Sequence, residues 1–202
     1  MTSDSQQEPT VFVVDDDEQI RKAMRFLLAS AGLKAEAYAS GSEFLESFDP
    51  SRPGCLVLDI RMPGLGGLEL QERLAETGSG LPIIFVTGHA DVPMAVEAMQ
   101  KGAFDFVQKP FRDEELLERI NAALARDREV RSTQAARADI ARRLETLTAR
   151  EREVMELVVT GKPNKVIAWE LGVSQRTVEI HRARVMEKMK ARSLAELVRM
   201  TL

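Results

Sequence analysis

Short apolar runs alternate with helix-like segments over residues 11–124, and this alternation limits the possible folds more than any other feature. The strand-like runs lie at residues 11–14, 55–58, 83–86 and 104–107, with a weaker one at 35–38. Apolar residues at helical spacing fall between them, at residues 20–31, 68–74, 92–99 and 114–124. Strands that alternate with helices are typical of a parallel sheet covered on both faces. We therefore predict a doubly wound α/β domain with five strands and five helices.

The pattern changes beyond this domain. Residues 126–143 are rich in Ala, Arg, Asp and Glu and contain no Gly or Pro, which predicts a helical linker that continues the preceding helix. From Leu147 onward, short helical segments are separated by Gly- and Ser-containing turns. We therefore divide the chain into an α/β domain at 9–127, a helical linker at 128–143 and an all-α domain at 144–202.

Charge divides the chain in the same way. Residues 1–136 carry 14 Lys/Arg and 23 Asp/Glu, a net −9, whereas residues 137–202 carry 14 and 9, a net +5. The basic part is the candidate for binding a polyanion. No apolar run approaches the roughly 20 residues that cross a membrane, and residues 1–9 do not resemble a signal peptide. The single cysteine, Cys55, cannot form an internal disulfide, so we expect a cytoplasmic protein.

Five polar residues follow the strand-like runs of the first domain. Asp15 and Asp16 follow the first run, Asp59 ends the third, Thr87 ends the fourth, and Lys109 follows the fifth. The carboxyl ends of parallel strands form the binding crevice of such folds. If the first and third strands are neighbours, the three carboxylates converge there.

Three converging carboxylates repel one another unless a cation lies between them. Oxygen ligands in an open site suit Mg²⁺, which keeps waters and accepts phosphate oxygens. A carboxylate can itself act as a nucleophile and form an aspartyl phosphate. Lys109 would then stabilise charge on the phosphoryl oxygens, and Thr87 could hydrogen-bond to one of them. The chemistry predicted for this site is Mg²⁺-dependent phosphoryl transfer.

Four motifs in this order resemble the receiver domain of response regulators. They are Val13-Val14-Asp15-Asp16-Asp17, Leu58-Asp59-Ile60-Arg61-Met62-Pro63-Gly64, Val86-Thr87-Gly88 and Lys109-Pro110-Phe111. The resemblance covers residues 9–127 and implies a flavodoxin-like fold. It also implies a cis peptide bond between Lys109 and Pro110. Asp17 or Asp16 could alternatively serve only as a helix N-cap.

The resemblance assigns a role to each site residue. It implies that Asp59 is the phosphoacceptor, and that Asp15, Asp16 and the backbone carbonyl of Arg61 complete the Mg²⁺ ligands with Asp59. Thr87 and Lys109 match the positions that sense the phosphoryl group. Phe106 matches the aromatic position that turns inward as the threonine moves.

The run at residues 87–96 is similar to the FixJ-type branch of receivers. That resemblance implies a homodimer, formed on phosphorylation through the fourth helix and fifth strand, within residues 92–112. His89 in this run is expected to be a solvated loop histidine and not a metal ligand.

The second domain contains two helices joined by a tight turn. An earlier helix, at 147–160, opens with the capping-box spacing of Thr148 and Glu151. The first helix of the pair, at 164–171, ends at Gly172. Ser174 caps the next, at 175–189, and the arrangement is that of a helix-turn-helix DNA-binding motif. In this last helix Val178, Val185 and Met189 should pack inward. Trp169 is expected in the small core.

Residues 147–200 resemble the LuxR-type helix-turn-helix of NarL and FixJ regulators. The carrying residues include Leu147-Thr148-Ala149-Arg150-Glu151, Asn164-Lys165-Val166-Ile167-Ala168 and Thr177-Val178. Glu179, Ile180 and Ala183 fall where base readers sit, which favours contact with thymine methyls and a cytosine amino group. Contacts to the DNA backbone are expected from Lys165, Thr177 and Lys188. The remaining candidate DNA contacts are Ser174, Gln175, Arg176, His181, Arg182 and Arg184.

These features predict a response regulator of a two-component system. Its expected partners are a sensor histidine kinase, double-stranded DNA, RNA polymerase and a second copy of the chain, with no membrane. The first alternative is an Mg²⁺-dependent phosphatase, but Ile60 and Arg61 stand where such an enzyme needs a second aspartate. The second alternative is a degenerate receiver that acts only as a DNA-binding dimer, and the intact acidic set argues against it. We therefore expect that the protein is not an enzyme.

Overall fold

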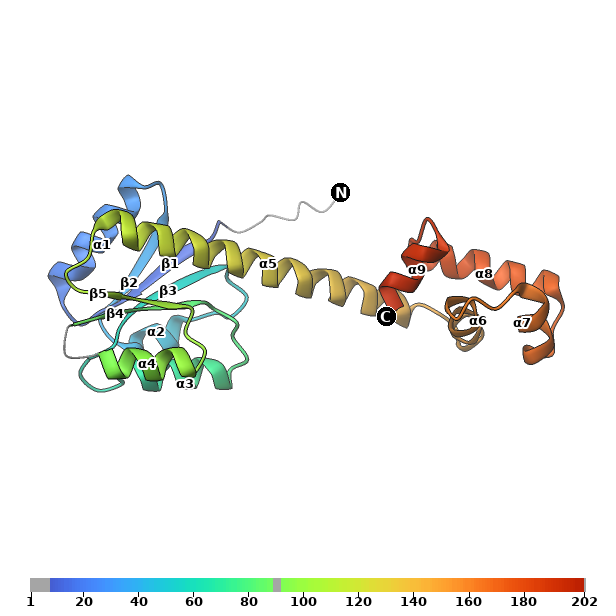
Figure 1. Ribbon diagram of the computed structural model, residues 1–202, viewed down its shortest axis with the longest axis horizontal. Coiled ribbons are helices and arrows are strands. Elements are labelled where there is room, and N and C mark those ends of the chain that lie inside the picture. The colour runs from blue at the N-terminus through green and yellow to red at the C-terminus, as the bar shows by residue number, and fades with distance from the viewer. Residues whose placement is uncertain (1–7, 89–91, 202) are drawn as a thin grey trace. The chain divides into compact units, whose positions relative to one another are not determined.

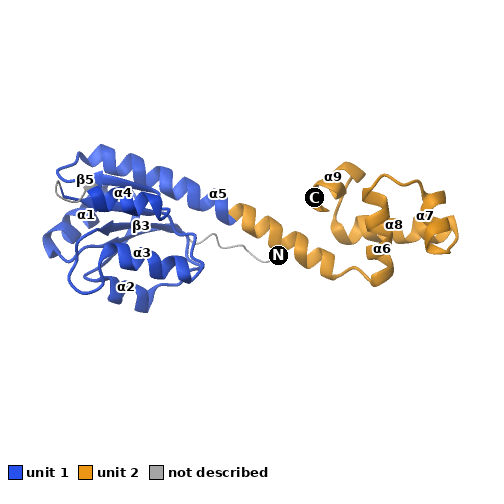
Figure 2. Ribbon diagram, turned by 60° about the horizontal axis from the view of Figure 1, so that its bottom comes forward, with its two compact units in different colours: residues 1–131 blue, residues 132–202 orange. Residues whose placement is uncertain are grey.

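The computed structural model describes residues 8–88 and 92–201, so His89 lies outside the described residues. The chain divides into two compact units between Arg131 and Ser132, as Figure 2 shows by colour. Each unit has its own hydrophobic core.

The first unit is a five-stranded parallel sheet flanked by helices (Figure 1). Its strands are β1 (Thr10–Val14), β2 (Lys34–Tyr38), β3 (Gly54–Asp59), β4 (Ile83–Thr87) and β5 (Asp105–Gln108). Its helices are α1 (Glu18–Ser30), α2 (Gly41–Ser47), α3 (Gly67–Glu76), α4 (Val92–Gln100) and the first part of α5 (Asp113–Glu145). The strand order is β2-β1-β3-β4-β5, with every neighbouring pair parallel. The predicted doubly wound α/β fold is confirmed.

Alternate residues of the central strands supply the two cores. Leu56 and Leu58 of β3 face a cluster that contains Phe44 of α2 and residues of α3 and α4. Cys55 and Val57 face the cluster built with α1 and α5 on the other side. Figure 1 shows these two helix layers on opposite faces of the sheet. Burial on both faces explains why the strands read as continuous apolar runs.

The strand order brings the ends of β1 and β3 together. Val14 is paired with Leu58 in the parallel register of these two strands. The chain therefore leaves both strands at the same edge, with Asp15 following β1 and Asp59 ending β3. Asp17 accepts a hydrogen bond from the Gln19 backbone N–H at 2.7 Å and is the N-cap of α1. Of the three consecutive aspartates at 15–17, Asp17 is therefore the one that caps α1.

The second unit is helical and contains α6 (Ala149–Val159), α7 (Asn164–Leu171), α8 (Gln175–Met189) and α9 (Leu194–Thr201). Thr148 and Glu151 form the predicted capping box, and Ser174 accepts the Thr177 backbone N–H at the start of α8. Gly172 ends α7 with a φ of 65°, a conformation that a residue with a Cβ adopts rarely. The predicted helix-turn-helix is confirmed.

Helix α5 contributes to both units. Asp127 is buried and accepts the Gly54 backbone N–H at 2.9 Å in the first unit. Ile140 and Leu144 pack against the core of the second unit. Between them, residues 132–138 are exposed. The segment predicted as a helical linker is therefore helical, and its far end is part of a hydrophobic core.

Trp169 is not in the core, contrary to the expectation from sequence, because its side chain is 82% exposed. The buried residues of α7 are Ile167 and Ala168, and at about 100° per residue the following position turns away from the core. The expectation was wrong because it relied on residue type without the phase of the helix.

Across residues 8–88 and 92–201, the structure contains no helix that is both long enough and apolar enough to span a bilayer.

Candidate functional site

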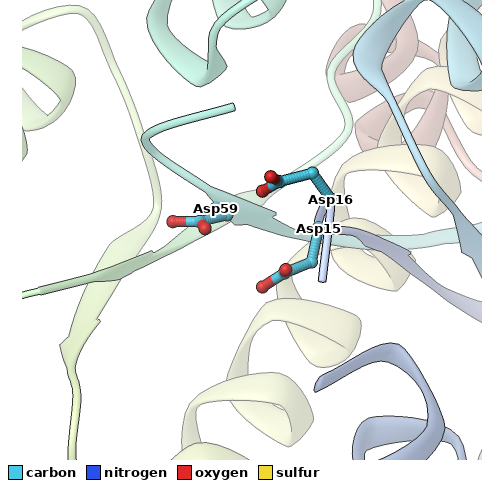
Figure 3. A group of neighbouring side chains, drawn as sticks. All are labelled: Asp15, Asp16 and Asp59. Carbon is cyan, nitrogen blue, oxygen red and sulfur yellow. The ribbon is translucent and has the colours of Figure 1, made fainter. Parts of the chain in front are cut away.

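Three carboxylates from two neighbouring strands converge at the carboxyl edge of the sheet. One oxygen each from Asp15, Asp16 and Asp59 lie within 4.8 Å of one another. Figure 3 shows the three side chains extending in the same direction from the ends of β1 and β3. Asp15 is buried, Asp59 is half-buried and Asp16 is exposed, so the cluster opens to solvent on one side.

Hydrogen bonds hold the loop after β1 in place. An Asp15 carboxylate oxygen accepts the Asp17 backbone N–H at 2.9 Å. The Arg21 guanidinium donates to the backbone carbonyls of Asp15 at 2.7 Å and Asp16 at 2.8 Å. Arg21 was missed by the sequence analysis, since a basic residue on an amphipathic helix gives no signal that distinguishes it from a solvated one.

Lys109 supplies a positive charge beside the carboxylates. Its Nζ lies 3.3 Å from an Asp15 oxygen and 3.7 Å from an Asp59 oxygen. Its backbone N–H donates to the Thr87 carbonyl at 2.7 Å, which fixes the loop after β5 to the end of β4. The Lys109–Pro110 peptide bond is cis, as expected.

The remaining receiver candidates lie on β4, β5 and the loop after β3. Thr87 is fully buried, and its hydroxyl donates to the Gly88 carbonyl at 3.1 Å. Phe106 is partly buried and packs against the core on the α2, α3 and α4 face. Arg61 is exposed, and its backbone N–H approaches an Asp59 oxygen at 3.4 Å. The structure therefore brings Asp15, Asp16, Asp59 and Lys109 together, with Thr87 joined to Lys109 through the backbone.

The electrostatics of the cluster favour an added cation. Burial raises the pKa of the Asp59 carboxyl, and the nearby Asp15 carboxylate raises it further, while Lys109 acts in the opposite direction. The three carboxylates outnumber the two positive charges described beside them, the Lys109 ammonium and the Arg21 guanidinium, so negative charge is in excess. A donor set made only of carboxylate oxygens, open on one side, fits a hard divalent cation such as Mg²⁺.

A second candidate surface lies on the exposed face of α8. Val178, Val185 and Met189 are buried as predicted, which leaves the candidate base readers facing solvent. The exposed residues of this face are Gln175, Arg176, Glu179, Ile180, Ala183 and Arg184. Lys165 on α7 is also exposed. A helix with one buried face and a basic, exposed face can enter a major groove.

Several other DNA candidates already have protein partners. Arg182 donates to the Asn164 side-chain oxygen at 3.2 Å, and the Ser174 and Thr177 hydroxyls lie 2.8 Å apart. His181 is half-buried, and its Nδ1 has no hydrogen-bond partner among the described residues.

Lys188 is tied to the start of α6. Its ammonium donates to Glu151 at 2.6 Å and to the Thr146 carbonyl at 2.9 Å. This ammonium and the Thr148 backbone N–H lower the pKa of the buried Glu151 carboxyl to about 2. A phosphate would therefore compete with Glu151 for Lys188.

Comparison with known proteins agrees with both units. Residues 11–121 match the model of the response regulator receiver domain, and residues 145–201 match that of the bacterial regulatory proteins of the luxR family. Nodulation protein W of Bradyrhizobium diazoefficiens is 51% identical over 95% of this chain and 84% of its own length. The transcriptional regulatory protein FixJ of Azorhizobium caulinodans is 48% identical over 95% of this chain and 91% of its own.

Solved structures agree with these family matches. The response regulator StyR is 45% identical and superimposes with a TM-score of 0.90 over 96% of this chain and 98% of its own. Full-length FixJ from B. japonicum is 44% identical, with a TM-score of 0.62 over 96% of each chain. The chain therefore belongs to the FixJ family of two-component response regulators, which join a receiver domain to a LuxR-type DNA-binding domain and control transcription.

Proposed function

We propose that a sensor histidine kinase phosphorylates this chain on Asp59, and that Asp15, Asp16 and the Arg61 backbone carbonyl hold Mg²⁺ together with Asp59. The observation that carries the proposal is the convergence of three carboxylates within 4.8 Å beside the Lys109 ammonium. Asp59 is the only one of the three that ends β3, where the resemblance assigns the phosphoacceptor.

The transfer follows from the chemistry of these residues. A carboxylate oxygen of Asp59 attacks the phosphorus, the new O–P bond forms, and the phosphorus–nitrogen bond of the donor histidine breaks. When bound, Mg²⁺ would neutralise charge on the phosphoryl oxygens. Lys109 can reach the same oxygens because it already spans Asp15 and Asp59. Ile60 and Arg61 provide no acid or base for turnover, so we expect the phosphorylated protein to be a signalling state and not an enzyme intermediate.

Thr87 and Phe106 would couple the phosphoryl group to the surface. In the present structure the Thr87 hydroxyl bonds to Gly88, within its own loop. A phosphoryl oxygen on Asp59 offers a stronger, charged acceptor, and moving Thr87 toward it would leave room for Phe106 to turn inward. The face formed by α4 and β5, within residues 92–112, would then become the contact of a homodimer.

The second unit would bind double-stranded DNA with α8 in the major groove. Glu179, Ile180 and Ala183 would read bases, and the exposed basic residues would contact phosphates. Arg184 and Lys165 are the freer candidates for phosphate contacts, since Arg182 and Lys188 have protein partners and Arg176 is paired with Glu179 at 3.3 Å. RNA polymerase in the cytoplasm would be the further partner of such a regulator.

The test is phosphorylation of the full-length protein by acetyl phosphate and Mg²⁺, followed by a sizing column. We expect a base-labile phosphoprotein and a shift toward dimer for the parent, and neither for Asp59→Asn. The matched control is Asp49→Asn, which removes a carboxylate in the loop before β3, at the opposite edge of the sheet. Equal labelling of Asp59→Asn and the parent would show that the phosphoacceptor is assigned to the wrong residue.

A further inference from the structure

The α7 helix presents an unusual set of side chains to solvent. Trp169 is 82% exposed and Val166 is 37% exposed, and Lys165 beside them is exposed as well. We call these three residues the α7 outer face. Trp169 is the only tryptophan of the chain. Large apolar side chains that remain exposed in a well-packed unit mark interaction sites when they are grouped.

The three side chains are neighbours on one helix surface. Lys165 and Trp169 are four residues apart, and Val166 and Trp169 are three apart, which are the spacings of adjacent positions. Helical side chains incline toward the N-terminus of their helix. The indole of Trp169 therefore leans toward Lys165 and the first turn of α7.

This first turn adjoins the helix proposed to enter the major groove. The Arg182 guanidinium, in the middle of α8, donates to the Asn164 side chain at the first position of α7. In helix-turn-helix proteins, the helix that precedes the recognition helix crosses the DNA backbone. The helix that carries the α7 outer face therefore lies beside the middle of α8, in the place of the helix that crosses the DNA backbone in such proteins.

The charge on this face also suits phosphates. Lys162 is paired with Glu170 at 2.7 Å, whereas Lys165 has no ion pair within the part of the chain that the structure describes. The ammonium of Lys165 and the Nε1–H of Trp169 are both donors, and phosphate oxygens are acceptors. The unit that carries them is basic, with a net +5 over residues 137–202. An acidic protein surface could use the same donors, but the place of α7 beside α8 favours DNA.

We propose that Trp169 is a DNA-backbone contact: its ring packs against a deoxyribose, and its Nε1–H donates to a phosphate oxygen next to the one bound by Lys165. This contact rests on the proposed entry of α8 into the major groove. Because it involves no base edge, it would strengthen binding to any sequence and help to fix the register of α8.

The fluorescence of the single tryptophan reports on this contact directly. Full-length protein with Mg²⁺ and acetyl phosphate is titrated at low salt with a random duplex of about 30 base pairs, roughly three helical turns. Binding is measured in parallel by the anisotropy of the same duplex carrying a dye. We expect the Trp169 emission to change along the binding curve and its quenching by acrylamide to fall.

Variants give a second, independent readout. Trp169→Ala should weaken binding by more than about tenfold, because it removes the ring contact as well as a hydrogen bond to a charged group, and such a hydrogen bond alone is worth about tenfold. Trp169→Phe should lose less DNA affinity than Trp169→Ala, because the ring contact remains. Since the indole is neutral, Trp169→Ala should keep the salt dependence of the parent, whereas Lys165→Ala should reduce its slope by about 0.9. The matched control is Phe26→Ala on α1, which removes another aromatic ring, 79% exposed, and should leave DNA affinity unchanged.

Each result has a definite meaning. If the duplex binds while Trp169 stays open to acrylamide and Trp169→Ala binds like the parent, the contact is refuted and DNA binding stands. An emission change that follows protein concentration without DNA would mean that a second copy covers Trp169, which also overturns the proposal. Normal DNA binding by Trp169→Ala with loss of transcription by RNA polymerase would assign the face to a protein partner instead. Absence of DNA binding in every assay would remove the proposed function itself.

Discussion

Glu151→Gln should destabilise the second unit in a way that depends on pH. The Glu151 side chain is 3% exposed and accepts from the Lys188 ammonium at 2.6 Å and from the Thr148 backbone N–H at 2.9 Å. Glutamine keeps the shape and can still accept from Thr148, so the substitution removes the charge and leaves the capping box.

Above about pH 5, Glu151→Gln should lower the stability of the second unit by about 1–2 kcal/mol. This is the range for a hydrogen bond between charged groups, reduced because Lys188 is one-third exposed. The pKa of Glu151 falls from 4.5 to about 2 on folding. A lowered pKa means that the carboxylate stabilises the fold above 4.5, and that this stabilisation is lost as the pH falls toward 2. The difference between parent and variant should therefore shrink over that interval and vanish below it.

Hydrogen exchange of peptides from α6 and α8, followed by mass spectrometry, measures the second unit separately from the first. The control is Glu153→Gln on the same helix, because Glu153 pairs with Arg150 at 2.6 Å but is 49% exposed. Glu153→Gln should lower the stability of the second unit by no more than about 0.5 kcal/mol. If the effect of Glu151→Gln were the same at pH 3 and pH 7, the ion pair with Lys188 would not be its cause.

Three further predictions concern the first unit. The Arg131 guanidinium pairs with buried Asp127 and donates to the carbonyls of residues 50, 51 and 52. Arg131→Ala removes these contacts, so we expect the free energy of unfolding measured in urea to fall by about 3 kcal/mol. Gly54→Ala would place a Cβ 2.0 Å from the Thr10 carbonyl oxygen, so stability should fall by more than about 4 kcal/mol, and a near-normal unfolding midpoint would contradict this close approach. Mg²⁺ should raise the thermal midpoint of the parent, and Asp16→Asn should require at least roughly tenfold more Mg²⁺ for the same rise; identical titrations would argue against Asp16 as a ligand.

The sequence identified most of what local patterns determine. The bounds of α7 and α8 follow from helical spacing, from Gly172 and from the Ser174 cap, and the structure has the same bounds. Five receiver candidates could be placed at strand ends, because strands and turns are encoded locally; they are Asp15, Asp16, Asp59, Thr87 and Lys109. The convergence of Asp15 with Asp59 needed the strand order as well, which pairs β1 with β3 and is a property of the whole sheet.

Long-range and orientational features could not be predicted. Lys188 and Glu151 are separated by 37 positions, and Arg131 reaches carbonyls about 80 positions away, so neither partner leaves a periodic trace in the sequence. Arg21 acts on backbone carbonyls, which every residue has. Trp169 was misplaced because its residue type favours burial while its position on α7 faces solvent.

The course of α5 determines where this protein can be divided or recombined with its relatives. A DNA-binding fragment that starts at residue 144 would lack Ile140 of the core and the bond from Arg143 to the Met189 carbonyl at the end of α8. A receiver fragment that stops at residue 127 would lack Arg131 and leave the Asp127 carboxylate buried without its cation. Chimeras that exchange DNA-binding units should therefore be joined within residues 132–138, where the helix is exposed on all sides and a new junction disturbs neither core.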